Sequence, residues 1–350
     1  MEKRYGLVYM GSKEKILHLI EYILQREQDR ETFVDLFCGG LSVSAFVLKH
    51  TEMNVVANDL NHYVIALYRE LIFNSGNEFE KVRYQWISRS KFEEVRDYPH
   101  NFPDWYVGYV LNIWSFGCNQ KDYLYARDLE EDKKALHYAI VEKDFSYMDS
   151  NSIFDGFKSY LERSVFWDIS YKLNAEVRSV FMEKFNKFIN DSQGTKNYKQ
   201  LRRLKMVVNL SLLEKVDAIY ELIAHRDRLK LTSLDWKDSL RLIGDATLSN
   251  AVVYCDPPYE DTKQYQVGSG FDYFNFWHWF RNSEYPIYVS SYKAAEDIEP
   301  INFEEKIQLL DNGNFGENKP KKKVYENIYW NKKGGSVQTL LDLLFTKEPS

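Results

Sequence analysis

The sequence is poor in the residues that build disulfide frameworks and metal sites. Its 350 residues include three cysteines, Cys38, Cys118 and Cys255, which lie far apart and form neither a CxxC motif nor a Cys/His cluster. This spacing argues against a disulfide scaffold and indicates no metal site. We expect each cysteine to be a small buried side chain.

Long apolar runs are also absent. No stretch approaches the roughly 20 residues that cross a bilayer, and Met1-Glu2-Lys3-Arg4 leads into no apolar signal-peptide segment. These absences predict a cytoplasmic protein without a membrane partner. Hydrophobic residues still make up 44% of the chain and aromatic residues 16%, so we expect a sizeable core in one large domain with an insertion, or in two domains.

An excess of positive charge is missing as well. The net charge is −6, which argues against non-specific coating of nucleic acid. The local distribution is different, because ten residues without an acid contain the cations Lys196, Lys199, Arg202, Arg203 and Lys205. Taken alone, such a run favours a solvated face, and a nucleic-acid surface is the alternative.

A strand–turn–helix pattern opens the chain's first recognisable unit. Residues 33–37 (FVDLF) read as a buried strand, which is followed by Cys38-Gly39-Gly40 and a helical stretch. A second strand, 54–58, ends beside Asp59, about twenty residues after the glycine turn, the distance at which an acidic residue binds ribose hydroxyls in nucleotide-binding βαβ units. The pattern indicates a nucleotide-type site, and a purely structural glycine turn is the alternative.

The most distinctive stretch is a second strand end. Residues 252–255 are β-favouring and apolar, and they stop at Asp256-Pro257-Pro258-Tyr259. The prolines fix the backbone and lack N–H groups, so the chain cannot continue as helix or central strand. A carboxylate and neighbouring carbonyls are left as acceptors for an amino group with two hydrogens, and Tyr259 offers a face for a planar base. A plain strand-ending turn is the alternative.

Between these strand ends the chain changes character. Residues 79–227 are rich in Tyr, Trp, Lys and Arg and contain helical patterns at 105–116, 173–190 and 199–225. Residues 111–125 (LNIWSFGCNQKDYLY) mix aromatic and amide side chains, which suits either base reading and stacking or a helical core. From 228 onward strands and helices resume, with strands at 228–236 and 286–292 and a closing hairpin of 303–310 with 324–330, joined by a mobile link at 311–323.

With these segments in this order, the chain resembles the Dam-type (D12 class) adenine-specific DNA methyltransferases. The resemblance rests on YMGSK, FVDLFCGG, NDL, LNIWSFG, RLKLTSLDW, VVYCDPPY and YVSSY in sequence. It implies an α/β fold: a Rossmann-like sheet with helices on both faces, formed by residues 1–78 and 228–350. Residues 79–227 would be an inserted, mainly helical subdomain that recognises DNA.

The resemblance also implies roles for individual residues. The catalytic residues would be Asp256, Pro257, Pro258 and Tyr259. S-adenosyl-L-methionine, the implied cofactor, would bind Tyr9, Gly11, Lys13, Asp35, Phe37, Gly39, Asp59 and Asp235. Double-stranded DNA, the implied partner, would contact Asn112, Phe116, Gly117 and Lys121, together with the cations Lys199, Arg202 and Arg203.

The implied reaction is methylation of the 6-amino group of a flipped-out adenine. The resemblance also implies a bacterial or phage-encoded enzyme, for which a cognate restriction enzyme is a candidate partner. The oligomeric state is left open. Three positions depart from the family pattern. Ser12 and Leu41 each replace a glycine, and Lys121 is the nearest cation where an arginine is usual. The alternatives are methylation of a cytosine amino group, of RNA or of a glutamine side chain, and an inactive DNA-binding relative.

Overall fold

The computed structural model describes residues 5–7, 9, 11, 13–162, 175–205, 208–258, 270–292, 294, 297–298, 300–301, 308–310, 323–325 and 327–334. Over these ranges no helix has both the length and the apolar character that crossing a membrane requires.

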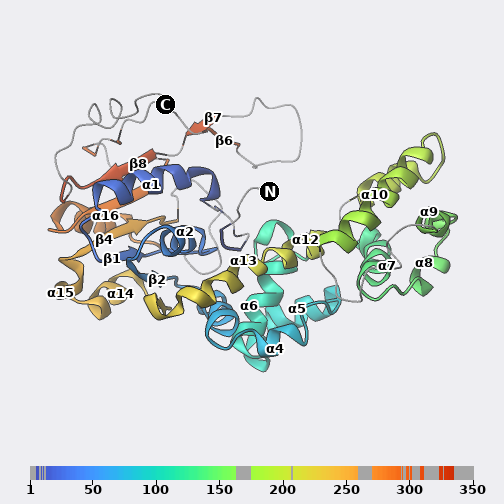
Figure 1. The fold of residues 1–350 in the computed structure, drawn as a ribbon, viewed down its shortest axis with the longest axis horizontal. Helices are drawn as coiled ribbons and strands as arrows, with labels where there is room; N and C mark the ends of the chain where they lie inside the picture. Colours follow the sequence, from blue (N-terminus) through green and yellow to red (C-terminus); the bar gives the residue numbers. More distant parts are fainter. Residues whose placement is uncertain are drawn as a thin grey trace. The chain divides into compact units, whose positions relative to one another are not determined.

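Contacts along the chain define two compact units. The sheet unit consists of Met1–Gly6, Gly11–Ile65 and Glu221–Ser350, and the helical unit consists of Leu7–Met10 and Ala66–Tyr220. The sheet unit combines a mostly parallel sheet with helices on its faces, which confirms the predicted α/β, Rossmann-like fold (Figure 1).

The main sheet has the strand order β3-β2-β1-β4-β5-β8. Its strands are β1 (Thr32–Asp35), β2 (Asn54–Asn58), β3 (Leu229–Thr232), β4 (Ala251–Cys255), β5 (Ile287–Ser291) and β8 (Asn327–Trp330). The first five are parallel, and β8 runs antiparallel to β5. Nearly all residues of β1, β2, β4 and β5 are buried, as expected for parallel strands covered on both faces.

Helices cover both faces of this sheet. They are η1 (Glu14–Ile16), α1 (Leu17–Arg26), α2 (Ser42–His50), η8 (Glu221–Arg228), α14 (Trp236–Ile243), α15 (Asp245–Leu248) and α16 (Tyr273–Asn282), and α3 (His62–Tyr68) continues into the helical unit. On one face Val34, Val253 and Val289 pack against Trp236 and Phe276. Alternate strand residues turn to the other face, on which α1 and α2 lie.

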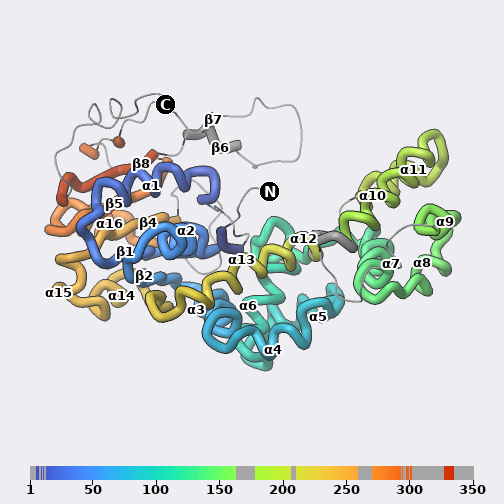
Figure 2. Tube along the Cα trace, viewed as in Figure 1, coloured from blue at the N-terminus to red at the C-terminus, as the bar shows by residue number. Residues whose placement is uncertain are grey.

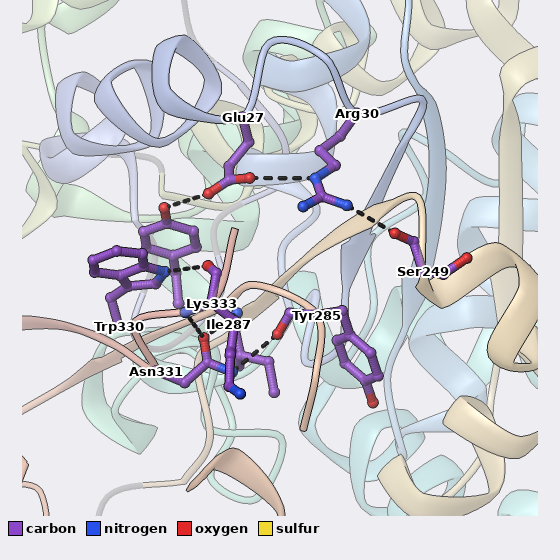
Figure 3. Close-up of polar contacts among 9 residues, drawn as sticks. Glu27, Arg30, Ser249, Tyr285, Ile287, Trp330, Asn331 and Lys333 are labelled. Atoms are coloured by element: carbon purple, nitrogen blue, oxygen red, sulfur yellow. Dashed lines mark hydrogen bonds and ion pairs between the residues drawn. The ribbon is translucent and has the colours of Figure 1, made fainter. Parts of the chain in front are cut away.

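A polar network fixes α1 to the sheet at the end remote from the strands' carboxyl ends. The buried carboxylate of Glu27 accepts hydrogen bonds from Tyr288 Oη at 2.8 Å and from Arg30 Nε at 3.4 Å. Arg30 also donates to the carbonyl of Ser249 at 2.7 Å (Figure 3). Asn331, the residue after β8, accepts a hydrogen bond from the backbone N–H of Ile287. These bonds join α1, β4, β5 and β8 at the end of the sheet that is remote from the strands' carboxyl ends.

The predicted closing hairpin is half right. β6 (Gln308–Leu310) and β7 (Lys323–Tyr325) pair antiparallel, as expected for 303–310 with 324–330. The segment 324–330 is not one strand, however, because 327–330 leaves the hairpin and pairs with β5 as β8. The link predicted to be mobile lies outside the described residues, apart from Lys323 at its end.

The described residues of the helical unit form mostly short helices (Figure 2). They are η2 (Arg69–Phe73, a π-helix), α4 (Asn77–Glu80), α5 (Arg89–Asp97), η3 (Pro99–Asn101), α6 (Asp104–Ile113), η4 (Phe116–Cys118), η5 (Arg127–Leu129), α7 (Glu130–Val141), α8 (Ser146–Asp149), η6 (Ser152–Phe154), α9 (Phe157–Leu161), α10 (Ala175–Asp191), α11 (Tyr198–Leu204), α12 (Val208–Glu214) and α13 (Asp217–Tyr220).

One helix prediction in this unit is wrong. The segment 199–225 is not continuous and is divided among α11, α12, α13 and η8. A buried guanidinium contributes to the break, since Arg83 donates to the carbonyl of Leu213 at the end of α12 and pairs with Asp217 at the start of α13. Arg83 thus satisfies a terminal helix carbonyl that a further helical turn would otherwise satisfy.

Candidate active site at the carboxyl edge of the sheet

Three of the predicted site carboxylates follow neighbouring strands. Asp35 ends β1, Asp59 comes directly after β2, and Asp256 comes directly after β4. Because β1 pairs in parallel with both β2 and β4, these strand ends meet at one edge of the sheet. The strand order reverses between β1 and β4, and open parallel sheets bind ligands in the crevice outside such a reversal.

Asp59 joins the end of β2 to the glycine turn. Its two carboxylate oxygens accept the backbone N–H groups of Gly39 at 2.9 Å and Asn61 at 2.8 Å. Burial raises the pKa of Asp59, while these two hydrogen bonds act in the opposite direction. The structure therefore brings Gly39 and Asp59 together, as their spacing predicts, and holds the turn in a fixed position.

The side chain of Asn58, which precedes Asp59, connects the ends of three strands by hydrogen bonds. Asn58 was not among the site residues predicted from the sequence. Its amide nitrogen donates to the carbonyls of Leu36 and Leu234, and its amide oxygen accepts from Thr232 Oγ1 and the Leu234 N–H. These bonds link the segments after β1, β2 and β3. The carboxylates of Asp59 and Asp235 are consequently presented from fixed backbone.

Asp35 lies beneath the glycine turn. The side chain is buried, and it accepts a 2.6 Å hydrogen bond from Ser44 Oγ on α2. Burial raises the pKa of Asp35 to about 7, the Ser44 hydrogen bond lowers it, and the charges of Asp256 and Asp59 raise it. Within this structure the contact of Asp35 is with the start of α2, which positions the turn.

Leu41 adopts a backbone conformation that favours glycine. It has φ 65° and ψ 14°, a left-handed conformation, and its side chain is completely buried. A left-handed conformation costs a non-glycine residue about 1–2 kcal/mol. The chain crosses this point closely, because a Cβ on Gly6 would lie 2.2 Å from the Gly40 carbonyl oxygen. Leu41 therefore holds a strained backbone conformation at this close crossing.

The carboxylate of Asp256 is held from both sides. Lys13 Nζ lies 2.7 Å from Oδ2, and Ser290 Oγ donates to Oδ1 at 3.2 Å. Lys13 is itself buried and also donates to the Gly11 carbonyl at 2.9 Å. Lys13, predicted among the cofactor residues, is thus placed directly on the predicted catalytic carboxylate.

Aromatic side chains contact the turn of Asp256, Pro257 and Pro258 after β4, which we call the proline corner. Tyr273 Oη donates to the Pro258 carbonyl at 2.7 Å, and the ring of Phe271 packs on Tyr273 with centroids 4.8 Å apart. Phe271 also packs on Phe37, which follows β1. Side chains from α16 and the segment before it therefore connect the corner after β4 with the loop after β1.

Other predicted site residues have different placements. Asp235 is exposed at the start of α14, where its carboxylate accepts the Lys237 N–H at 2.9 Å. Gly11 has φ 82° and belongs to the sheet unit, whereas Tyr9 belongs to the segment grouped with the helical unit. Tyr259 lies outside the described residues.

A comparison with known protein families gives this geometry a context. Residues 9–166 match the family model of the D12 class N6 adenine-specific DNA methyltransferases. The match supports an adenine-specific DNA methyltransferase. It includes Lys13, the ends of β1 and β2, and the start of the helical unit; the Asp256 corner follows the matched residues in the chain.

Within the part matched to these methyltransferases, one loop of the helical unit is constrained and exposed. It runs from Ser115 to Tyr123, which form an isolated β-bridge. Gly117, Cys118 and Gln120 have φ values of 61°, 57° and 60°. The loop presents Phe116, 60% exposed, on its outer side. Backbone strain of this kind persists where surrounding contacts over-determine it and is common at functional sites.

The predicted DNA-facing residues do not share one environment. Phe116 and Lys121 are exposed, whereas Asn112 on α6 is completely buried, so the structure does not bring Asn112 to the surface. On α11 three predicted cations, Lys199, Arg202 and Arg203, are exposed. Arg203 forms an ion pair with Asp128, and Arg202 lies over the ring of Tyr198.

The functional residues that the sequence reasoning missed are mainly those that support the carboxylates. Ser44, Asn58, Tyr273 and Ser290 each contact a predicted site residue or the backbone next to one. Tyr254 in turn donates a hydrogen bond to Ser290. Leu60 was also missed, although it stands beside Asp59 and is one of the few large apolar side chains left exposed. For Asn58 and Ser290 the sequence did carry a signal, because both are polar residues at the carboxyl ends of predicted strands.

Proposed function

We propose that this chain transfers a methyl group from S-adenosylmethionine to the 6-amino group of an adenine flipped out of duplex DNA. The observation that carries the proposal is the placement of Asp256 at the carboxyl edge, oriented by Lys13 and Ser290 and directly followed by two prolines. The neighbouring Gly39 turn and Asp59 provide a nucleotide-type site at the same edge.

The residues around the Gly39 turn fit the proposed cofactor. Asp59 uses both oxygens on backbone N–H groups, and a carboxylate has about four lone-pair positions, so it can still accept ribose hydroxyls. The exposed side chain of Leu60 offers an apolar surface for a base, and Asp235 presents a carboxylate from the start of α14. In this proposal Tyr9, Gly11 and Phe37 complete the cofactor site.

When bound, S-adenosylmethionine supplies an electrophilic methyl group on a positively charged sulfur. Asp256 and the Pro257 carbonyl accept hydrogen bonds from the two amino hydrogens of adenine, which favours a pyramidal nitrogen and stabilises its developing positive charge. Transfer of the methyl group to the nitrogen would break the carbon–sulfur bond, whose electron pair would stay on sulfur. The methylated nitrogen would then lose one proton to water.

Most of the acceleration in this scheme comes from positioning and electrostatics. The buried surroundings of Asp256 support that view, since Lys13 is buried and the Ser290 hydroxyl is fully buried. Extracting the adenine from the duplex costs a few kcal/mol. We assign the stacking partner to Tyr259 and the wedge into the duplex to Phe116, which is exposed on its constrained loop.

The helical unit is proposed to hold the DNA. Its α11 presents Lys199, Arg202 and Arg203 to solvent, and Lys121 is exposed on the Ser115–Tyr123 loop. Phosphate contacts from such cations supply affinity that falls with salt and carries no sequence information. Gly117 contributes to the backbone conformation that exposes Phe116.

The test is the identity of the modified nucleoside. Duplex DNA is incubated with the protein and deuterium-labelled S-adenosylmethionine, digested, and analysed by mass spectrometry. The proposal predicts label in N6-methyladenine. Label in N4-methylcytosine, label found in RNA but not in DNA, or no labelled nucleoside in a preparation that binds the cofactor would contradict it.

A further inference from the structure

Two buried hydroxyl groups stand in series behind Asp256. Tyr254 Oη donates to Ser290 Oγ at 2.9 Å, and Ser290 Oγ donates to Asp256 Oδ1 at 3.2 Å. Tyr254 is 1% exposed and Ser290 is completely buried. Neither residue was assigned a role from the sequence, although both belong to strands that end at the candidate active site.

The register of the sheet brings the three side chains together. Tyr254 on β4 pairs with Tyr288 on β5, and Cys255 pairs with Val289. Alternate residues of a strand face the same side, so Tyr254, Asp256 and Ser290 share one face of the sheet. Because both strands are buried and central, this arrangement is fixed by the backbone ladder before any ligand binds.

The charges around Asp256 make its orientation important. Lys13 provides a positive charge at 2.7 Å from Oδ2. The carboxylates of Asp35 and Asp59 are near enough for the negative charge of Asp256 to raise the pKa of each. Negative neighbours disfavour an ionised carboxylate, and hydrogen-bond donors favour it. Donation from Ser290 to one oxygen and from Lys13 to the other fixes the carboxylate plane and supports its ionised form.

We propose that Tyr254 and Ser290 are positioning residues for the methyl transfer, with Ser290 orienting the carboxylate of Asp256 and Tyr254 acting through Ser290. The inference rests on the proposed function of Asp256. Hydrogen bonds in a buried chain strengthen one another, so the Tyr254 hydroxyl holds the Ser290 hydroxyl in the donating geometry. The amino group of the target base then meets an acceptor that is already aligned.

The contribution of the Tyr254 hydroxyl can be tested separately from the packing of the Tyr254 ring. The ring of Tyr254 stacks on Phe33 with centroids 6.3 Å apart, and a phenylalanine retains this contact. Tyr254→Phe therefore removes the donor alone. Ser290→Ala removes the donor to Asp256, and the double variant Tyr254→Phe/Ser290→Ala also removes the hydroxyl that the single change leaves buried.

The sheet itself provides matched controls. Tyr288 is the register partner of Tyr254 and is fully buried, but its hydroxyl donates to Glu27 rather than toward Asp256. Tyr288→Phe therefore makes the same chemical change one strand away. Ser239 on α14 is also completely buried, so Ser239→Ala controls for loss of a buried serine hydroxyl. Both controls are expected to retain the wild-type rate of the folded protein.

The experiment measures the single-turnover rate of methyl transfer to duplex DNA as a function of pH, together with the dissociation constant of S-adenosylmethionine. Ser290→Ala should lower the rate about tenfold, the effect of losing one hydrogen bond to a charged acceptor. It should also move the acidic limb of the rate profile to higher pH while leaving cofactor affinity unchanged. Tyr254→Phe should act in the same direction by a smaller factor.

The double variant decides whether the two hydroxyls work as one chain. It should be no slower than Ser290→Ala, because Tyr254 acts through Ser290. Losses that multiply, an unmoved acidic limb, or equal losses in Tyr288→Phe and Ser239→Ala would overturn the inference. Asp256→Ala run in parallel separates this failure from that of the proposed function, since methyl transfer by Asp256→Ala would contradict the function itself.

Discussion

The side chains at the carboxyl edge of the sheet unit and the exposed side chains of the helical unit differ in their burial and in their polar partners. At the sheet edge, Asp35, Asp59 and Asp256 each have specific donors, and most of those donors are buried. In the helical unit, Phe116 and the cations of α11 face solvent, and Arg203 is paired only at the surface with Asp128. We infer that the first region is organised for chemistry at one position, and the second for a large, variable partner.

This contrast separates two kinds of energetic effect. Removing a donor or acceptor in a buried network leaves another group unsatisfied, whereas removing a surface ion pair changes stability by about 0–1 kcal/mol. Changes at the sheet edge should therefore affect cofactor binding and catalysis strongly. Changes on the helical unit should affect DNA binding, with little effect on folding.

The largest effect among the following variants is expected at Asp59. Asp59→Ala removes the acceptor for the Gly39 and Asn61 N–H groups and the proposed ribose ligand. The affinity for S-adenosylmethionine should fall roughly 100-fold, as expected for two hydrogen bonds to a charged group. Calorimetric titration measures it. Asp238→Ala on the surface of α14 is the control, and an unchanged dissociation constant in Asp59→Ala would remove Asp59 from the cofactor site.

Phe116 should come next. Phe116→Ala should weaken productive DNA binding by about 10- to 100-fold, because stacking of one base on an aromatic ring contributes about 1–3 kcal/mol. Stability should be unchanged, since the ring is already exposed. Tyr98→Ala, which removes an aromatic ring of nearly equal exposure, 57%, is the control. The measurement is kcat/KM for duplex DNA, and equal losses in the two variants would show that Phe116 has no specific role.

Asp35 gives a pH test of the buried edge. Its pKa is raised by burial from 3.8 to about 7, so between these values the folded protein binds a proton that the unfolded chain has released. The free energy of unfolding should therefore decrease as the pH rises from about 4 to about 7.

Asp35→Asn cannot release this proton and should flatten that part of the stability profile. Urea unfolding followed at several pH values gives the comparison. Asp235→Asn is the control, because Asp235 is exposed and asparagine is a good residue for the start of a helix. A profile that keeps its slope in Asp35→Asn would assign the pH dependence to other groups.

The smallest effect is expected at α11. Arg203→Ala should reduce the slope of log affinity against log salt concentration for DNA by about 1 and should weaken binding to all sequences alike. Arg241→Ala, which removes a surface arginine of the sheet unit paired with Asp238, is the control. If the two variants give the same salt slope as the unmodified protein, the cations of α11 form a solvated face, as their sequence alone suggests.

Local sequence patterns predicted where the strands lie better than they predicted which strands pair with each other. The strands around Val34, Val55 and Val253 follow from apolar runs, and the order of motifs predicts the α/β sheet. The segment 324–330 is an example of a strand pattern whose partners could not be predicted. Its residues favour a strand throughout, but one part pairs with β6 and the other with β5, which depends on partners distant in sequence.

The candidate site shows the same division. Carboxylates at strand ends could be predicted because a parallel sheet brings those ends to one edge. Their donors could not, since Asp256 contacts Lys13, which lies near the other end of the chain, and Ser290, which lies on the neighbouring strand. The burial of Asn112 was also hidden, because an amide among aromatic residues fits a helical core as well as a DNA surface.

The most direct test of the account is methyl transfer by Asp256→Ala, measured in a single turnover at saturating S-adenosylmethionine and duplex DNA. We expect a loss of at least about 100-fold, since an electrostatic acceptor is removed from the reacting nitrogen. Calorimetry should show cofactor binding close to that of the unmodified protein. A rate within about tenfold of the unmodified protein's would contradict it.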